Sequence, residues 1–454
     1  MKVLKFGGSV LKNSADIKNI TNIILESSKQ EDKIIAVFSA FYGITDKLIT
    51  LGEITANEEN YNQKLQEIKD FHINIANELK LKTEAILQVE KLFKKIENTL
   101  LIIADRKKIF NDTKDYLISF GERLSNFIVF SYISQQADAI QISPCEMIKT
   151  DSNFGCAKVD LVKSNECIQN KIKNTKEKIV ICAGFFGADS NDNITTIGRN
   201  GSDYSASIIA GALKVKQLEI WKDIDGLFTA DPKIVKNVKF IKTISYQEMA
   251  ELSSLGNKVL HINAIAPCIK NNIPIILRNC YNTSCDGTLI GNKEAKNYCI
   301  NGIAKCDNVE IVKLKLGEYI DMTEFSIKLQ NIIKVIEDGV ITISQNIKQK
   351  QISILMLKTK TTQFNEMLDN LFKHEIKNEE FTIEKWSNKA MISVVGEDFL
   401  QSVGLAGNIF NALKKNNISV DAIQDDFSST RISFVCDTNE ANKIICLLHD
   451  ELVN

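Results

Sequence analysis

The chain has 454 residues, a formal net charge of −1 and 44% hydrophobic residues. This length allows about two to four domains with full cores, and the apolar content excludes extensive disorder. Acidic and basic residues nearly balance and form no like-charge block, so nothing favours a nucleic-acid surface. The eleven cysteines include no Cys-x-x-Cys pair and the four histidines are scattered, which argues against a disulfide framework or a zinc site. No apolar run forms a signal core or approaches the length of a membrane span, so we expect a cytoplasmic protein.

The N-terminal segment predicts a strand that ends in a glycine turn. Lys2 to Phe6 runs into Gly7-Gly8-Ser9, and an amphipathic helix follows from Asp16 to Ser27. Glycines let backbone amides approach an anion, and the following helix adds its positive end. The turn matches neither the Walker lysine loop nor the dinucleotide fingerprint, so it is a weak signal by itself. Lys5 either reaches a transferred phosphate or is a solvated strand-end lysine.

A second strand, Lys33 to Ser39, is apolar along its length, as expected for a parallel strand covered on both faces. It continues into Ser39-Ala-Phe-Tyr-Gly-Ile-Thr45, and hydroxyls just past a strand's carboxyl end lie where open α/β sheets bind ligands. Thr45 can bind a ligand, cap the helix from Asp46 to Leu51, or do both.

Residues 53–116 are charged and carry apolar residues at helical spacing, which predicts a helical lobe beside the sheet. The lobe closes at Ser119-Phe-Gly-Glu122, just before a predicted helix from Asn126 to Gln135. Glu122 can be a surface acid favoured by the helix dipole, or it can receive a ligand amine. The spacing does not choose between these two roles.

The most informative stretch is a turn with two glycines, Gly198-Arg-Asn-Gly201, followed by Ser202, Asp203 and a buried helix from Tyr204 to Leu213. Ser202 or Asp203 can cap this helix. Capping does not explain the arginine, because a guanidinium fixed on a tight turn suits planar recognition of a carboxylate or phosphate. A further strand, Lys216 to Asp223, again has acidic and basic groups past its end.

Beyond a polar link at 292–297 the pattern changes to short strands that alternate with helices. Two small α+β units of about 70 residues each fit this length. They contain no catalytic constellation and look like paired binding modules. Strands are expected near 309–314, 352–357, 391–395 and 430–436, and helices near 323–336, 363–373, 402–415 and 439–451.

Seven phrases in a fixed order give the chain a specific family resemblance. They are Lys5-Phe-Gly-Gly-Ser9, Ser39-Ala-x-x-Gly-Ile-Thr45, Phe120-Gly-Glu-Arg123, Gly184-Phe-Phe-Gly187, Gly198-Arg-Asn-Gly-Ser-Asp-Tyr-Ser205, Asp223-Ile-Asp-Gly-Leu-Phe-Thr-Ala-Asp-Pro232 and Gly256-x-Lys-Val-Leu-His261. Together they resemble the aspartokinases of the amino-acid-kinase family, and the C-terminal part resembles two ACT modules. The phrase from Asn417 to Gln424 is most similar to the kinase half of bifunctional aspartokinase–homoserine dehydrogenases.

The resemblance implies an α/β fold, with an open, mainly parallel sheet between helices, followed by two ferredoxin-like ACT modules. We expect a catalytic domain at 1–291, a first ACT-like module at 298–385 and a second at 386–454. Because no Gly-x-Gly-x-x-Gly loop follows, we expect a single activity rather than an added dehydrogenase.

The implied reaction is phosphorylation of the β-carboxylate of L-aspartate by ATP with Mg²⁺, the first step toward lysine, threonine and methionine. No metal ligand is implied on the protein. The resemblance assigns catalysis to Lys5 and Asp203, and substrate binding to Ser39, Thr45, Glu122, Arg199 and Ser202. It assigns nucleotide binding to Lys5, Phe6, Gly7, Gly8, Ser9, Lys222, Asp223, Phe228, Lys233 and Lys258.

Five positions depart from the family pattern. Val10 stands where a hydroxyl residue is usual, Lys222 where threonine is usual, Phe228 where tyrosine is usual and Lys233 where arginine is usual. Asn200 replaces a common glycine, although the dehydrogenase-fused branch shares this asparagine. The remaining core set predicts an active enzyme.

The ACT modules imply feedback by an amino acid, threonine or lysine, with Gln424 as the candidate effector contact, and a homodimer or larger homo-oligomer. Two other readings remain: a kinase for another acidic amino acid, and a non-catalytic amino-acid sensor. Lys5 and Asp203 argue against the sensor, because a binding module has no use for a phosphoryl-transfer lysine.

Overall fold

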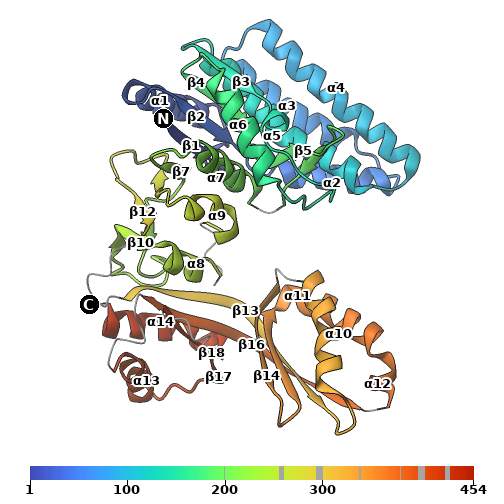
Figure 1. Ribbon diagram of the computed structural model, residues 1–454, viewed down its shortest axis with the longest axis vertical. Coiled ribbons are helices and arrows are strands. Elements are labelled where there is room, and N and C mark those ends of the chain that lie inside the picture. Colours follow the sequence, from blue (N-terminus) through green and yellow to red (C-terminus); the bar gives the residue numbers. More distant parts are fainter. Residues whose placement is uncertain are drawn as a thin grey trace. The chain divides into compact units, whose positions relative to one another are not determined.

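The computed structural model describes residues 1–198, 200–254, 260–292, 300–336, 339–378, 380–396, 404–424 and 430–453. The chain forms two compact units, shown in Figure 1. The first comprises Met1–Leu227, Ile241–Tyr246 and Leu260–Lys293, and the second comprises Phe228–Phe240, Gln247–Val259 and Glu294–Asn454. The domain boundaries expected near 291, 298 and 385 stay predictions.

The first unit is built on an eight-stranded sheet in the order β10-β12-β11-β7-β1-β2-β4-β3. All neighbouring pairs are parallel except β11 with β12. The central strands are apolar on both faces and fully buried, as parallel strands between helices are. The strands are β1 (Lys2–Phe6), β2 (Ile34–Phe38), β3 (Ala139–Ile142), β4 (Ile179–Ala183), β7 (Leu218–Lys222), β10 (Thr243–Ser245), β11 (Ile275–Asn279) and β12 (Thr288–Gly291).

Helices pack on this sheet and extend beyond it as the predicted helical lobe (Figure 1). They are α1 (Ser14–Gln30), α2 (Ile44–Ala56), α3 (Asn62–Glu78), α4 (Thr83–Arg106), α5 (Asn111–Ile133), α6 (Leu161–Lys173), α7 (Gly201–Leu213) and α9 (Ile262–Lys270). In the lobe, the buried ring of His72 meets Phe41, Phe71 and Phe93 edge-on. Burial lowers the pKa of His72 to about 4, so this ring is neutral and part of the core.

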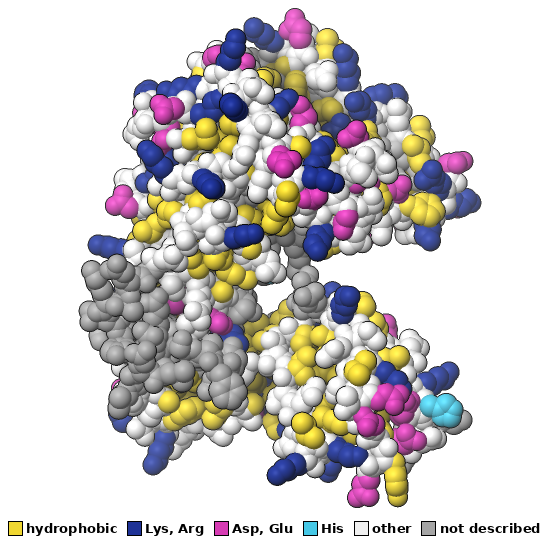
Figure 2. All heavy atoms as spheres, in the orientation of Figure 1, with side chains coloured by type: hydrophobic (Ala, Val, Ile, Leu, Met, Phe, Trp, Pro, Cys, Tyr) yellow, Lys and Arg dark blue, Asp and Glu magenta, His cyan; other side chains and the backbone are white. Residues whose placement is uncertain are grey.

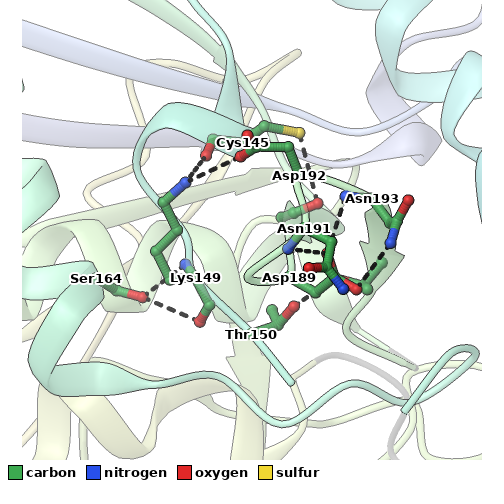
Figure 3. A network of polar contacts seen from close by, with 10 residues as sticks. Cys145, Lys149, Thr150, Ser164, Asp189, Asn191, Asp192 and Asn193 are labelled. Carbon is green, nitrogen blue, oxygen red and sulfur yellow. Dashed lines mark hydrogen bonds and ion pairs between the residues drawn. The ribbon is translucent and has the colours of Figure 1, made fainter. Parts of the chain in front are cut away.

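A short hairpin, β5 (Phe186–Ala188) and β6 (Ile194–Thr196), leads from the sheet into α7. Its turn is fixed by Asp189, whose carboxylate accepts the backbone amides of Asn191 and Asn193 at 2.9 Å each and the Ser152 hydroxyl at 2.8 Å (Figure 3). Beside it, the Lys149 ammonium donates to the Cys145 carbonyl at 2.9 Å. The hairpin therefore owes its position to polar side chains as well as to packing.

The second unit is built on a six-stranded antiparallel sheet in the order β14-β15-β13-β16-β18-β17. Its strands are β13 (Ile300–Leu316), β14 (Val340–Asn346), β15 (Gln351–Leu357), β16 (Phe381–Gly396), β17 (Ala422–Gln424) and β18 (Arg431–Asp437). Its helices are α8 (Tyr246–Ser254), α10 (Met322–Val335), α11 (Lys358–Leu371), α12 (Lys373–Lys377), α13 (Leu405–Lys415) and α14 (Thr438–Leu452). The predicted α+β character is confirmed, but the strands β13 and β16 are long and continuous, and position 385 falls inside β16.

Two hydrophobic cores lie along this sheet. One joins alternate residues of β13 and β15 to α10 and α11, around Phe325 and Phe364. The other joins β16 and β18 to α13 and α14, around Phe434 and Ile444, and it also takes in Ala230 and Val235. These last two residues belong to a stretch that the sequence places among the nucleotide-binding phrases.

That stretch, Phe228–Phe240, begins and ends with two short paired strands, β8 (Leu227–Phe228) and β9 (Phe240–Ile241). The Thr229 hydroxyl lies 2.9 Å from Nε2 of the buried His449 in α14, and the Thr229 carbonyl accepts the Ile303 amide at 2.8 Å. Lys239 donates to the Val453 carbonyl at 2.5 Å. The segment is thus part of the second unit's fold, although it lies between sheet strands of the first unit in sequence.

On the face drawn in Figure 2, Lys and Arg side chains lie among Asp and Glu side chains, and those that the structure describes form no extended patch of one sign. This distribution agrees with the balanced composition.

Candidate active site

The centre of the candidate site is a buried ion pair at the carboxyl edge of the parallel sheet. Lys5 comes from the end of β1, and Asp203 comes from the first turn of α7. Their Nζ and Oδ1 atoms lie 2.5 Å apart, and each residue is only 4% exposed. Lys5 is therefore not a solvated strand-end lysine.

A second cation completes this centre. Nζ of Lys222, at the end of β7, lies 3.9 Å from the other carboxylate oxygen of Asp203. Burial by itself would raise the pKa of Asp203, but the charges of Lys5 and Lys222 hold that pKa below its usual range. Burial lowers the pKa of Lys222, which Asp203 partly counteracts. With both lysines charged, two cations share one carboxylate, and an anionic ligand would neutralise the excess.

The glycine turn passes directly beside Lys5. A β-carbon on Gly7 would lie 3.3 Å from Nζ of Lys5, and one on Gly8 would lie 3.2 Å from the Ala40 carbonyl oxygen. A side chain at either glycine would therefore crowd its neighbour, so glycine eases the close approach here. Val10 is fully buried in the core, which explains why this position holds an apolar residue in place of a hydroxyl.

Glu122 lies in the middle of α5 and is 4% exposed, so the prediction of a surface acid at a helix start is wrong. One of its oxygens accepts the Ala40 amide at 3.2 Å, and the other has no hydrogen-bond partner among the described residues. Burial raises its pKa to about 8, against the effect of hydrogen bonds and of the Lys5 charge. An ammonium group would supply both the missing donor and the missing charge.

The loop after β2 lies against α5 near Glu122. A β-carbon on Gly121 would lie 2.9 Å from that of Ala40 and 3.5 Å from Oγ1 of Thr45. The Ser125 hydroxyl donates to the Ser39 carbonyl at 2.7 Å. The structure therefore brings Ser39, Thr45 and Glu122 together, as the sequence predicted.

The predicted capping roles are wrong. The N-cap of α2 is Gly43, with φ of 74°, and the N-cap of α7 is Asn200, with φ of 57°. Neither helix end uses a side-chain cap, so Thr45, Ser202 and Asp203 are not caps. Ser202 is pressed against the end of β4, because a β-carbon on Gly184 would lie 2.7 Å from its Cα.

The other predicted site residues are distributed between the two units. Asp223 follows β7, with 43% of its side chain exposed and Nζ of Lys12 3.9 Å away. Phe228 belongs to the second unit, where its ring meets Phe240 edge-on at 5.6 Å. Lys233 is exposed there, and its amide donates to Asp231 at 2.9 Å.

Three predicted ligand contacts remain, at Gln424, Arg199 and Lys258. Gln424 lies in β17, and its side-chain oxygen has no hydrogen-bond partner in the part of the chain that the structure describes. Arg199 and Lys258 lie outside the described residues.

Sequence reasoning missed the buried acid Asp115. It lies two helical turns before Glu122 on α5, is fully buried, and accepts three hydrogen bonds, one from the Gly155 amide and two from Thr196 at the end of β6. The spacing of seven residues, which returns to the same helix face, could have indicated it.

Within the described parts of the chain, no three His, Cys, Asp or Glu side chains gather in a way that could hold a metal ion. Nor does any described helix combine the length and the hydropathy that crossing a membrane requires.

Two regions of the chain match known protein families. Residues 1–279 match the model of the amino acid kinase family, and residues 392–452 match an ACT domain model. The chain belongs to the amino acid kinase family. The resemblance to aspartokinases and the expected fold class are thereby confirmed.

The similar proteins of known name include aspartokinases from three bacteria. The bifunctional aspartokinase/homoserine dehydrogenase of Haemophilus influenzae is 29% identical over 465 residues, which cover all of this chain and 57% of the relative. The crystal structure of Clostridium acetobutylicum aspartate kinase is 28% identical, with a TM-score of 0.80 over the full length of both chains. Escherichia coli aspartokinase III, solved with aspartate and ADP, has the same fold, with a TM-score of 0.83 at 22% identity over both full chains. The chain thus spans little more than half the length of the Haemophilus relative.

Proposed function

We propose that this amino acid kinase is an aspartate kinase, which converts ATP and L-aspartate to ADP and 4-phospho-L-aspartate. The observation that carries the proposal is the buried Lys5–Asp203 pair with Lys222 beside it, close enough to Glu122 for the Lys5 charge to act on it. A cationic centre for phosphate and an unpartnered acid for an ammonium group are the two halves of an amino-acid kinase site.

The chemistry needs charge neutralisation more than proton transfer. The β-carboxylate of aspartate is ionised at neutral pH, so one of its oxygens attacks the γ-phosphorus without a general base. The bond to the β–γ bridging oxygen breaks and ADP leaves. Lys5 and Lys222 offset the negative charge of the transferred group, while Asp203 holds both lysines in place.

Substrate recognition follows from the groups around this centre. Glu122 accepts the aspartate ammonium, and Arg199 holds the α-carboxylate as a fork. The hydroxyls of Ser39, Thr45 and Ser202 hydrogen-bond the substrate. The nucleotide side consists of Phe6, Gly7, Gly8, Ser9, Asp223, Phe228, Lys233 and Lys258.

Mg²⁺ fits this scheme as an ion that enters with the nucleotide. Mg²⁺ is usually held by substrate phosphates and one or two carboxylates, and it supplies charge neutralisation on the phosphate oxygens. Asp223 is the carboxylate available for it, because Asp203 is occupied by lysines.

ADP release measured with aspartate and with glutamate tests the proposal. We expect turnover with aspartate and little with glutamate, whose extra methylene moves the acceptor carboxylate away from Lys5. Faster turnover with glutamate would favour a kinase for a related acidic amino acid. Absence of ADP release with both would favour the non-catalytic sensor.

We also propose that an amino acid regulates the enzyme, that the chain forms a homo-oligomer and that it is cytoplasmic. An amino-acid effector, threonine or lysine, would bind the ACT-like modules near Gln424, whose side-chain oxygen accepts no hydrogen bond from any described residue. It would act by binding one arrangement of the enzyme better than another. Assays with each amino acid at millimolar concentration test this, and unchanged rates with both contradict it. Size measurement in solution and cell fractionation test the proposed homo-oligomer and cytoplasmic location.

A further inference from the structure

The buried carboxylate of Asp115 is an acid that the proposed chemistry does not use. It accepts the Thr196 amide and the Thr196 hydroxyl at 2.7 Å each, and the Gly155 amide at 2.9 Å. Asp115 is 0% exposed, and no ion pair to it is found among the described residues. Burying a carboxylate without a cation costs free energy, and the three hydrogen bonds offset this cost. The role of Asp115 therefore depends on the segments that donate these bonds.

The donors lie in the two segments beside the arginine turn. Thr196 ends β6, only three residues before Arg199. Gly155 precedes Cys156, whose sulfur would lie 3.2 Å from a β-carbon on Gly198. Gly155 and Gly198 both have positive φ, 92° and 79°, so both segments are shaped by glycine and have little stiffness of their own. Asp115 fixes the two together.

The same helix carries the proposed ammonium acceptor. Asp115 and Glu122 are seven residues apart on α5, which places them on one face, about 10 Å apart along the axis. In any α-amino acid the ammonium and the carboxylate are joined to one carbon, so their protein partners must keep a fixed separation. One rigid helix that holds both Glu122 and the start of the arginine turn meets this requirement.

We propose that Asp115 is a positioning residue for amino-acid recognition, which fixes Thr196 and Gly155, beside the turn at Gly198, relative to Glu122. This rests on the proposed function, in which Glu122 and Arg199 bind the amino acid. In this role Asp115 acts through Thr196 and Gly155 and not by contact with a substrate, so its effect falls on the amino acid rather than on the nucleotide.

The hairpin offers a matched control at its other end. Asp189 is 2% exposed and accepts four hydrogen bonds, two from backbone amides and two from side chains. Figure 3 shows that its bonds close the turn between β5 and β6, which is the end remote from Arg199 in the chain. Asp189 is therefore a buried acid of the same hairpin for which no hydrogen bond to α5 is found among the described residues, although its bond to Ser152 reaches the loop that contains Gly155.

The test compares Asp115→Asn with Asp189→Asn by steady-state kinetics and thermal unfolding. Because hydrogen bonds to a charged group are lost, we expect Asp115→Asn to raise the KM for aspartate about 30-fold. The KM for ATP should stay within about threefold, since only differential binding of the amino acid changes. Asp189→Asn should lower Tm and leave the KM for aspartate within about twofold of wild type.

A second pair of variants guards against misfolding. Thr196→Val removes one donor to Asp115 and should raise the KM for aspartate, whereas Thr196→Ser keeps the hydroxyl and should restore it. Equal changes in both KM values, or an Asp189→Asn effect as large as that of Asp115→Asn, would overturn the positioning role. The wild-type assay separates the two proposals. Turnover with glutamate alone overturns the substrate assignment, and the KM comparison then applies to glutamate. No turnover with either amino acid overturns both.

Discussion

Two regions that the sequence assigns to the nucleotide are stabilised in different ways. At the sheet edge of the first unit, the buried cations of Lys5 and Lys222 share the carboxylate of Asp203. In the second unit, the segment Phe228–Phe240 has an apolar interior, with Ala230 and Val235 in the core that α13 and α14 complete. The charge centre is complete within one unit, whereas this segment depends on the fold of the ACT-bearing unit.

We therefore assign the phosphoryl-transfer step to the charge centre and part of nucleotide binding to the segment Phe228–Phe240. The contact between Lys5 and Asp203 involves no residue of the segment that carries Phe228 and Lys233. We therefore expect variants of the charge centre to lower kcat, and variants of the segment to act on stability and on the KM for ATP.

The largest effect is expected from Lys5→Ala. Loss of a charge that stabilises the transferred phosphoryl should cost about 3 kcal/mol of transition-state stabilisation, or more than about 100-fold in kcat. Lys2→Ala is the matched control, because Lys2 lies on the same strand and pairs with Glu219 at 2.9 Å, away from the site. An unchanged kcat in Lys5→Ala would refute the role of the charge centre.

The next effect concerns Glu122 and pH. Burial raises its folded-state pKa to about 8, so without substrate it is largely protonated at neutral pH. An ammonium ligand requires the ionised form, so affinity for aspartate should rise up to roughly tenfold per pH unit as the pH approaches 8. Glu122→Gln should bind aspartate weakly and show no such pH dependence in titration calorimetry.

The same shift has a consequence for stability with the opposite sign. A raised folded-state pKa stabilises the protein at low pH, and this contribution disappears as the pH rises through 8. Glu122→Gln should therefore lose less stability than wild type between pH 6 and pH 9, as followed by chemical denaturation. A pH-independent affinity for aspartate in the wild type would contradict both expectations.

The smallest effect is expected from Thr229→Val. It removes the partner of the buried His449, which should cost about 1 kcal/mol in the unfolding free energy, with a modest rise in the KM for ATP and an unchanged kcat. Thr382→Val is a suitable control, because Thr382 is exposed on β16. A large fall in kcat for Thr229→Val would show that the two regions are not separable.

The residues of the charge centre were singled out by the family resemblance, whereas the sequence pattern alone left Lys5 open and made Asp203 a cap candidate. The structure supplies the reason that they meet, because the parallel strands β1 and β7 end at one edge of the sheet beside α7. The resemblance also singled out Glu122, although it did not indicate that this acid is buried. Helix capping was predicted wrongly, since left-handed Gly43 and Asn200 begin these helices and a propensity for Ser, Thr and Asp does not reveal φ.

Other features depended on packing that no local pattern contains. Asp115 resembles any acid on a charged helix until its three donors, 40 and 81 residues further along the chain, are in place. The burial of Ala230 and Val235 was equally inaccessible, because their partners in α14 lie more than 200 residues away.

The shared core has a consequence for building chimaeric enzymes. A recombination junction near residue 291 would graft a foreign regulatory module onto this catalytic sequence. It would leave Ala230, Val235 and Thr229 facing helices for which they did not evolve. A functional exchange of regulators must transfer the segments 228–240 and 247–259 together with the C-terminal part. The residues that must be exchanged together therefore come from three separate stretches of the sequence.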